Sequence, residues 1–272
     1  MEKKKRTGSL AASPHIVWTV MFIVAPLLFV IYYTFTDYYG AFTLDNIFAL
    51  KEHIGTFTLS VSLSVIATFI CFIIGYPLAY IISRQKEKSQ KIMITLLMLP
   101  MWTNLLIRTY SMMAIMDDGG FLNTILGYLN LGKVHLIGTK GAVIFGMVYD
   151  FLPYMVLPIY TTISKLDKSL TEAAEDLGCN NIRVLTKVVL PLSSSGIVSG
   201  VTMVFVPSIS TFYISQKLGG GTFELIGDTI ERQFQNSTTY NVGAAISLVM
   251  MVLVLISLAI MNKFAGEEND ES

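Results

Sequence analysis

The chain has 272 residues, of which 53% are hydrophobic and 14% are charged, against about 45–50% and about 25% in an average globular protein. A mean hydropathy of +0.61 leaves too few charges to coat soluble domains and favours a bundle in lipid. A formal net charge of zero excludes the footprint of a basic nucleic-acid-binding domain. Cys71 and Cys179 are the only cysteines and have no metal-ligand spacing, so we interpret both as structural. No cofactor or metal site is expected.

Six apolar segments are long enough to cross a bilayer core, which takes about 20 residues. The first follows a basic start, but its apolar run is too long for a signal peptide and no small-residue cleavage site follows it. Prolines inside these segments are tolerated in bundled membrane helices, because neighbours satisfy the freed carbonyls. We therefore predict an all-α membrane protein with six transmembrane helices, at 16–36, 59–82, 92–116, 141–163, 197–215 and 242–261.

Lys and Arg side chains gather in alternate loops, a bias that marks the cytoplasmic side. Segments 1–15, 83–91 and 164–196 carry four each. Both termini are then predicted to be cytoplasmic. The expected organisation is a basic N-terminus at 1–15, a transmembrane domain at 16–262, and an acidic, disordered tail at 263–272.

Motifs for other functions are missing from the sequence. No GxxxxGK[ST] follows a strand, so the chain has no Walker A site with which to hydrolyse ATP. A membrane enzyme is disfavoured because all three histidines fall outside the spans and no HExxH occurs. An ion-coupled secondary transporter stays as an alternative, although its usual internal repeats are not found.

The loop between the fourth and fifth spans has a helical pattern. Ser169 and Glu172 have capping-box spacing, and Gly178 is the residue expected just past a helix end. Asn180 can cap a second amphipathic helix, which Pro191 is expected to stop. The sequence therefore predicts a short helix, a sharp glycine bend and a second helix on the inner membrane face.

This loop resembles the EAA signature of ABC importer permeases, EAA-x3-G-x9-I-x-LP. The only departure is one methylene, valine for isoleucine. In that family the loop docks into a groove on a separate ATPase subunit, and small alanines and a bending glycine suit close backbone approach. The alternative is that the glutamate and glycine serve only the cap and the turn. The matching residues are Glu172, Ala173, Ala174, Gly178, Val188, Leu190 and Pro191.

Segments 99–110, 118–123 and 165–168 are also similar to the first permease of spermidine/putrescine importers, and the likeness covers roughly residues 15–262. The resemblance implies a type I importer bundle in the bacterial cell membrane that is not itself an enzyme. Implied partners are two copies of an ABC ATPase subunit, a second homologous permease and an extracellular or periplasmic polyamine-binding protein. A permease for another small solute is the alternative.

Two charged side chains fall inside the predicted spans, where a charge is costly and therefore a functional hypothesis. At 1.5 Å per residue, Asp150 lies about 14 Å below the outer end of its span, and Arg108 about 12 Å below that of its own. The two side chains can therefore sit at the same depth. Either they form a structural ion pair, or Asp150 is a carboxylate that binds a cationic solute.

Aromatic rings near these charges could hold ammonium groups through cation–π contacts, although each ring is more often a packing residue. Asn104, Arg108 and Ser111 recur at helical spacing, so their face is expected to look into the bundle. The predicted solute pathway region comprises Trp102, Asn104, Arg108, Tyr110, Tyr149, Asp150 and Tyr154.

Overall fold

The structure is a computed structural model that describes residues 14–270. Helices dominate this range, and its one strand-like pairing is an isolated bridge between Thr36 and Phe42. The described residues form two compact units, residues 14–54 with 229–253 and residues 55–228 with 254–270. Among the described residues four helices are long and apolar enough to cross a membrane, and two bent helix pairs raise that number to as many as six. The predicted all-α membrane fold is confirmed.

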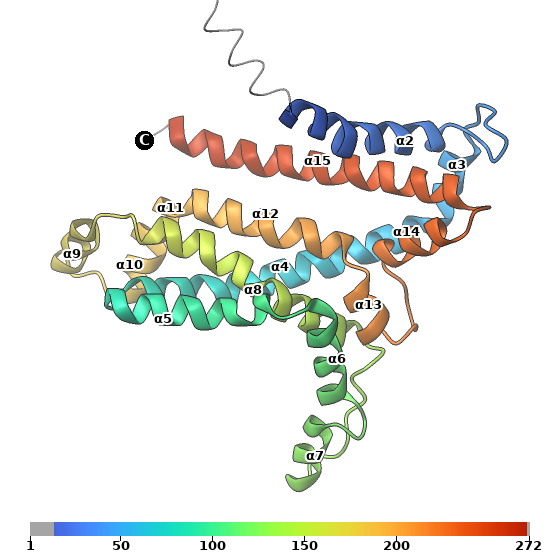
Figure 1. The fold of residues 1–272 in the computed structure, drawn as a ribbon. Helices are drawn as coiled ribbons and strands as arrows, with labels where there is room; N and C mark the ends of the chain where they lie inside the picture. The colour runs from blue at the N-terminus through green and yellow to red at the C-terminus, as the bar shows by residue number, and fades with distance from the viewer. Residues whose placement is uncertain (1–13, 271–272) are drawn as a thin grey trace, which may run out of the picture. The chain divides into compact units, whose positions relative to one another are not determined.

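Figure 1 labels the helices in chain order. They are a π-turn at Val20–Val24, α2 (Ala25–Thr34), α3 (Asp45–Phe48), a 3-10 turn at Ala49–His53, α4 (Ile54–Ser83), α5 (Glu87–Met98), a 3-10 turn at Leu99–Trp102, α6 (Leu105–Met116), α7 (Phe121–Tyr128), α8 (Lys140–Ile163), α9 (Lys168–Asp176), α10 (Asn181–Val184), a π-turn at Leu185–Val189, α11 (Leu190–Leu192), α12 (Ser194–Ser210), α13 (Tyr213–Leu218), α14 (Ile226–Gln235) and α15 (Tyr240–Asp270).

The first unit contains the first span, which runs from Pro14 to Thr34. Its π-turn precedes Pro26, a residue without an N–H, and the N–H of Ala25 donates to Val20 O instead. The loop after this span is tied down by Asn46, whose amide donates to Thr34 O at 3.1 Å and to Thr36 O at 2.8 Å. These bonds satisfy carbonyls that the end of α2 would otherwise leave free.

The core of the second unit is built around the contact between α8 and α12, the most extensive between any two of its helices. Gly196 and Gly200 form a GxxxG pair on α12. A Cβ at Gly196 would lie 2.5 Å from Thr162 Oγ1, and one at Gly200 would lie 3.0 Å from Met155 O. Small residues therefore let the two backbones approach closely, as in membrane helix pairs generally.

The predicted third span, 92–116, is wrong as a single straight helix. The chain leaves α5 through the 3-10 turn, becomes extended at Thr103 and Asn104, and restarts as α6. The stretch Glu87–Trp102 lies at 92° to Leu105–Tyr128. Pro100 lacks the N–H that would continue the α-helical ladder, and the side chain of Asn104 accepts a hydrogen bond from Leu106 N at 2.8 Å, which caps the new helix.

Three further expectations need correction or fall outside the structure. The fifth span, predicted at 197–215, starts earlier and ends at Ser210, and α13 follows as a separate short helix. The acidic tail was expected to be disordered, but α15 continues through it to Asp270. No proline interrupts the chain after the span, and alanine and glutamate favour helix there. The basic residues at 3–6 lie outside the described residues, and the predicted orientation of the termini stays a prediction.

Candidate coupling loop and intramembrane charges

Helix α9 begins one residue after Asp167, whose carboxylate accepts a hydrogen bond from the backbone N–H of Ser169 at 2.9 Å. This hydrogen bond lowers the pKa of Asp167, so the cap is present at neutral pH and is lost only as the pH falls through that lowered value. The predicted capping box with Ser169 as the N-cap is therefore wrong. Aspartate caps at least as well as serine, and the earlier start adds helical residues.

The bend after α9 has the geometry predicted from Gly178. The residue has φ +84°, and its N–H donates to Glu175 O at 2.9 Å. The N–H of Cys179 donates to Ala174 O at 3.0 Å, which completes a Schellman motif. A left-handed residue at this position is most easily a glycine. A Cβ on Gly178 would meet no atom of the chain within 4 Å, so the bend is open to the outside.

Two large apolar side chains stand exposed on either side of this bend, among charged and polar neighbours. Leu177 is 87% exposed and Ile182 is 70% exposed. Glu172 and Ala173 are exposed beside them, whereas Ala174 packs partly against the core of the second unit. The loop therefore offers two apolar side chains within reach of a partner, beside the small Ala173.

The second half of the loop is anchored to the bundle. Asn180 caps α10 by accepting a hydrogen bond from Arg183 N at 2.9 Å, as predicted. Pro191 does not stop the helix: the N–H of Leu190 donates to Leu185 O in a π-turn, and the helix continues to Leu192. Of the other signature residues, Val188 and Leu190 are half-buried and Pro191 is exposed.

The helix then turns sharply at Ser193. The stretch Asn181–Leu192 lies at 76° to α12. Ser193 is buried and its hydroxyl lies 3.0 Å from the hydroxyl of Tyr76 on α4. The contact between Tyr76 and Ser193 therefore holds the bend between α11 and α12 against α4.

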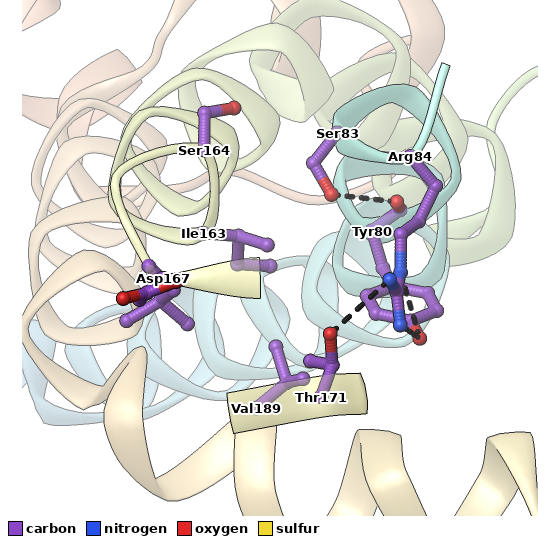
Figure 2. A pocket seen from close by; sticks show the side chains of 9 residues that line it. Tyr80, Ser83, Arg84, Ile163, Ser164, Asp167, Thr171 and Val189 are labelled. Carbon is purple, nitrogen blue, oxygen red and sulfur yellow. Dashed lines mark hydrogen bonds between the residues drawn. The ribbon is translucent and has the colours of Figure 1, made fainter. Parts of the chain in front are cut away.

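A cavity of about 130 Å³ lies beneath the α9–α10 loop (residues 168–184, the candidate coupling loop), where the ends of α4 and α8 meet the start of α9. Figure 2 shows Arg84 extending from α4 towards Thr171 on α9. The guanidinium donates to Thr171 Oγ1 at 3.3 Å and forms an ion pair with Glu175 Oε1 at 3.4 Å. It also donates to the hydroxyl of Tyr80 at 3.0 Å.

In the sequence, Arg84 stands out only as one of four positive charges in the predicted cytoplasmic loop 83–91. Its partners are 87 and 91 residues away, so no local pattern could have identified the contact. The one available signal is that Thr171 and Glu175 lie four residues apart, on one face of α9. Arg84 therefore joins α4 to the segment that carries the EAA signature.

If the α9–α10 loop receives an ATPase, as its resemblance to the EAA signature implies, Arg84→Gln should lower the ratio of solute moved to ATP hydrolysed about 1.4- to fivefold, because a half-exposed ion pair contributes about 0.2–1 kcal/mol. The measurement is uptake and ATP hydrolysis by the assembled transporter in proteoliposomes. Glu175→Gln should have a similar effect. Lys86→Gln, which removes an exposed charge from the same loop, is the matched control; an equal loss in that variant would mean that only the loop's charge matters.

The two intramembrane charges form the structural ion pair. Arg108 Nη1 lies 2.8 Å from Asp150 Oδ1, and the side chains are 14% and 2% exposed. The contact lacks hydrogen-bond geometry, and no other group in the described chain donates to the Asp150 carboxylate. The alternative in which Asp150 is free to bind a cation is therefore not the arrangement seen in this structure.

The remaining residues of the predicted solute pathway lie mostly on the outside of this chain. Asn104 and Ser111 are exposed in this chain, whereas Arg108 on the same face reaches Asp150 on α8, so the expectation that this face looks into the bundle and not at lipid stays a prediction. The buried face of α6 instead runs through Thr109, Met112 and Met116. The four predicted aromatics are all exposed by a third or more of their surface: Trp102, Tyr110, Tyr149 and Tyr154.

The described residues thus form a helical membrane protein in which the α9–α10 loop is exposed around a glycine bend. The chain matches the model of the family described as "Binding-protein-dependent transport system inner membrane component" over residues 10–265. The chain belongs to this family, and it is therefore a transport component of the bacterial cell membrane. The family match disfavours the secondary transporter, even though two of the candidate spans are bent helix pairs.

Curated relatives narrow the comparison. The chain is 37% identical over 250 residues to the spermidine/putrescine transport system permease protein PotB of Haemophilus influenzae, covering 88% of this chain and 87% of that protein. It is 35% identical over 253 residues to PotB of Escherichia coli strain K12, covering 89% and 92%. The PotB of Salmonella typhimurium strain LT2 is 36% identical over 253 residues, with 89% and 88% covered.

Solved structures agree on the fold. A chain of a bacterial ABC transporter involved in the import of the acidic polysaccharide alginate matches with a TM-score of 0.82 at 18% identity, covering 98% of both chains. The same kind of transporter in complex with an alginate-bound periplasmic protein also matches with a TM-score of 0.82, covering 97% of this chain and 96% of that one. At these identities the likeness establishes the fold and leaves the solute open.

Proposed function

We propose that the chain is a permease subunit of an ATP-driven importer of polyamines such as spermidine and putrescine. The observation that carries this proposal is the 35–37% identity to spermidine/putrescine permeases along nearly the whole chain. The subunit would work beside a second, similar permease, two copies of an ABC ATPase and an extracytoplasmic polyamine-binding protein. The chain itself would hydrolyse nothing.

The coupling loop is proposed to receive the ATPase. Its exposed apolar rim at Leu177 and Ile182 and its open glycine bend support this role. Closure of the ATPases on ATP would push α9 and α10, and the bundle would change from inward-open to outward-open by rigid-body movement. Arg84 and the Tyr76–Ser193 contact would pass that movement to α4 and α12.

The solute pathway is proposed to follow the exposed polar and aromatic face of α6 and α8, with a second permease completing it. Asn104, Tyr110 and Tyr154 lie on this face. Because Asp150 forms an ion pair with Arg108, a cationic solute would be attracted by aromatic faces and not by a free carboxylate. Weak binding along the path would let the solute leave quickly on the inner side. Selectivity for the solute would then depend mostly on the binding protein.

Uptake of radiolabelled spermidine and putrescine tests the proposal. Cells that lack the chain but keep its partners should lose energy-dependent uptake of a polyamine and regain it when the chain is supplied. Uptake should also disappear when the Walker A lysine of the ATPase subunit is replaced, because that subunit can then no longer hydrolyse ATP. The polyamine assignment would be refuted if deleting the chain left polyamine uptake unchanged and abolished the uptake of another solute. The family membership would be unaffected by that result.

A further inference from the structure

The side chain of Lys217 is placed over two tyrosine rings. Its Nζ lies 5.3 Å from the centroid of the Tyr110 ring and 5.8 Å from that of Tyr213. The rings meet edge to face, with centroids 6.3 Å apart and an interplanar angle of 80°. Both distances are within the roughly 6 Å at which an ammonium group is attracted to an aromatic face.

No carboxylate explains this placement of the lysine. The ion pairs of the described residues involve other side chains, and the buried Asp150 is already engaged by Arg108. Lys217 is half-buried, as is Tyr213, whereas Tyr110 is exposed. The ammonium group is therefore held by the two tyrosines, through their rings and through a side-chain hydrogen bond with Tyr110, and the exposed Tyr110 leaves the position open to small molecules.

The rings are positioned by rigid elements. Helix α13 is fixed against α8 because Ile214 and Leu218 are buried over Gly146, where a Cβ would lie 2.5 Å from Leu218 Cδ1. The hydroxyl of Ser215 on the same helix donates to Asp228 at 2.9 Å. The Tyr213 ring therefore keeps its place against α6 whether or not the flexible lysine stays.

We infer that Tyr110 and Tyr213 form a binding site for a primary alkylammonium group, which Lys217 occupies from within the chain until a solute ammonium displaces it. The lysine side chain carries a primary ammonium group on a four-carbon chain, the same unit that is found in a polyamine such as putrescine. A free diamine has the advantage of a second ammonium group that can contact other aromatic faces. This inference rests on the proposed function for the identity of the solute, and it assigns one point of solute contact on α6 and α13.

The test measures how fast Lys217 is acylated. The full chain, assembled with its partners in lipid nanodiscs, is treated with a water-soluble acetylating ester, and modification of individual lysines is followed by mass spectrometry. The probe is 1,4-bis(trimethylammonio)butane, a dication that cannot itself be acylated. We expect a saturating concentration to raise the rate at Lys217 between about twofold and about thirtyfold, the range set by one or two cation–π contacts.

Potassium chloride at the same ionic strength should leave this rate unchanged, and the exposed Lys133 should react equally in all conditions. In Tyr110→Leu and Tyr213→Leu the basal rate at Lys217 should already be high and insensitive to the dication. Tyr110→Phe and Tyr213→Phe lose the hydroxyls but keep the rings, so the rate at Lys217 should still rise with the dication in both variants.

A rate that does not respond to the dication, or that rises equally with potassium chloride, would overturn the inference. The same holds if the leucine variants, folded as judged by assembly with the partners, still respond to the dication. Because this measurement reads the ammonium site without transport, it is independent of the uptake experiment. Displacement of Lys217 without polyamine uptake would preserve the site and reject the polyamine assignment.

Discussion

Replacing Gly178 with aspartate should reduce solute uptake more than about tenfold while the chain still inserts and assembles with the second permease. Within the chain a side chain at this position meets open space, so the bundle should tolerate it. At a docked surface the same carboxylate would be desolvated without a partner, which typically costs about 3–5 kcal/mol, and tenfold corresponds to only about 1.4 kcal/mol. The measurement is uptake normalised to the amount of membrane-inserted chain.

The matched control is Gly132→Asp. Gly132 has φ +76° and open space around it, so backbone strain and local crowding are the same as at Gly178. It lies in the loop between α7 and α8, far along the chain from the coupling loop. This variant should keep the ATPase in the purified complex, whereas Gly178→Asp should lose it. Normal uptake by Gly178→Asp would refute the coupling role.

Replacing Arg108 with glutamine should cost the folded chain about 3–5 kcal/mol, because it leaves the Asp150 carboxylate buried without an opposite charge. For a chain of this size the expected fall in Tm is roughly 6–20 °C. The measurement is the temperature at which the detergent-solubilised chain loses its monodisperse elution peak. The double variant Arg108→Gln with Asp150→Asn should recover at least half of the loss, since no buried charge then remains.

The double variant also separates structure from transport. If the pair is structural, uptake per folded molecule should stay within about twofold of the unaltered chain. A double variant that folds normally but takes up no polyamine would place Asp150 in the solute path. Failure of the double variant to regain stability would mean that the pair contributes more by its mutual attraction than by avoiding a buried charge.

The features that the sequence predicted well depend on local chemistry. Apolar length located four of the six spans, and the left-handed preference of glycine located the bend at Gly178. The short polar side chain of Asn180 identified the second cap. Each follows from a few adjacent residues, so tertiary packing had little chance to override it.

The predictions from the sequence were wrong where two local structures, such as alternative helix caps or helix ends, have similar free energies. Asp167 and Ser169 could both cap α9, and their propensities do not decide between them. Pro100 ends a helix but Pro191 is absorbed by a π-turn, and only the packing around each distinguishes the two outcomes. Arg84 contacts α9 across more than 80 residues, a relation that no single sequence displays.

Crosslinking from Ala173 tests the central claim, that the α9–α10 loop docks on an ATPase subunit. Ala173 is exposed on α9, and the nearby Cys179 must first be changed to serine so that Ala173→Cys supplies the thiol at this site. A short maleimide–benzophenone reagent attached to this thiol should then, on irradiation, insert into a C–H bond of the ATPase and join the two chains in intact membranes. Tyr128→Cys on α7, where the side chain is 85% exposed, is the control and should not crosslink to it. A product from position 173 that contains the ATPase is the predicted result; no such product, or labelling of position 173 from outside sealed cells, would contradict the account.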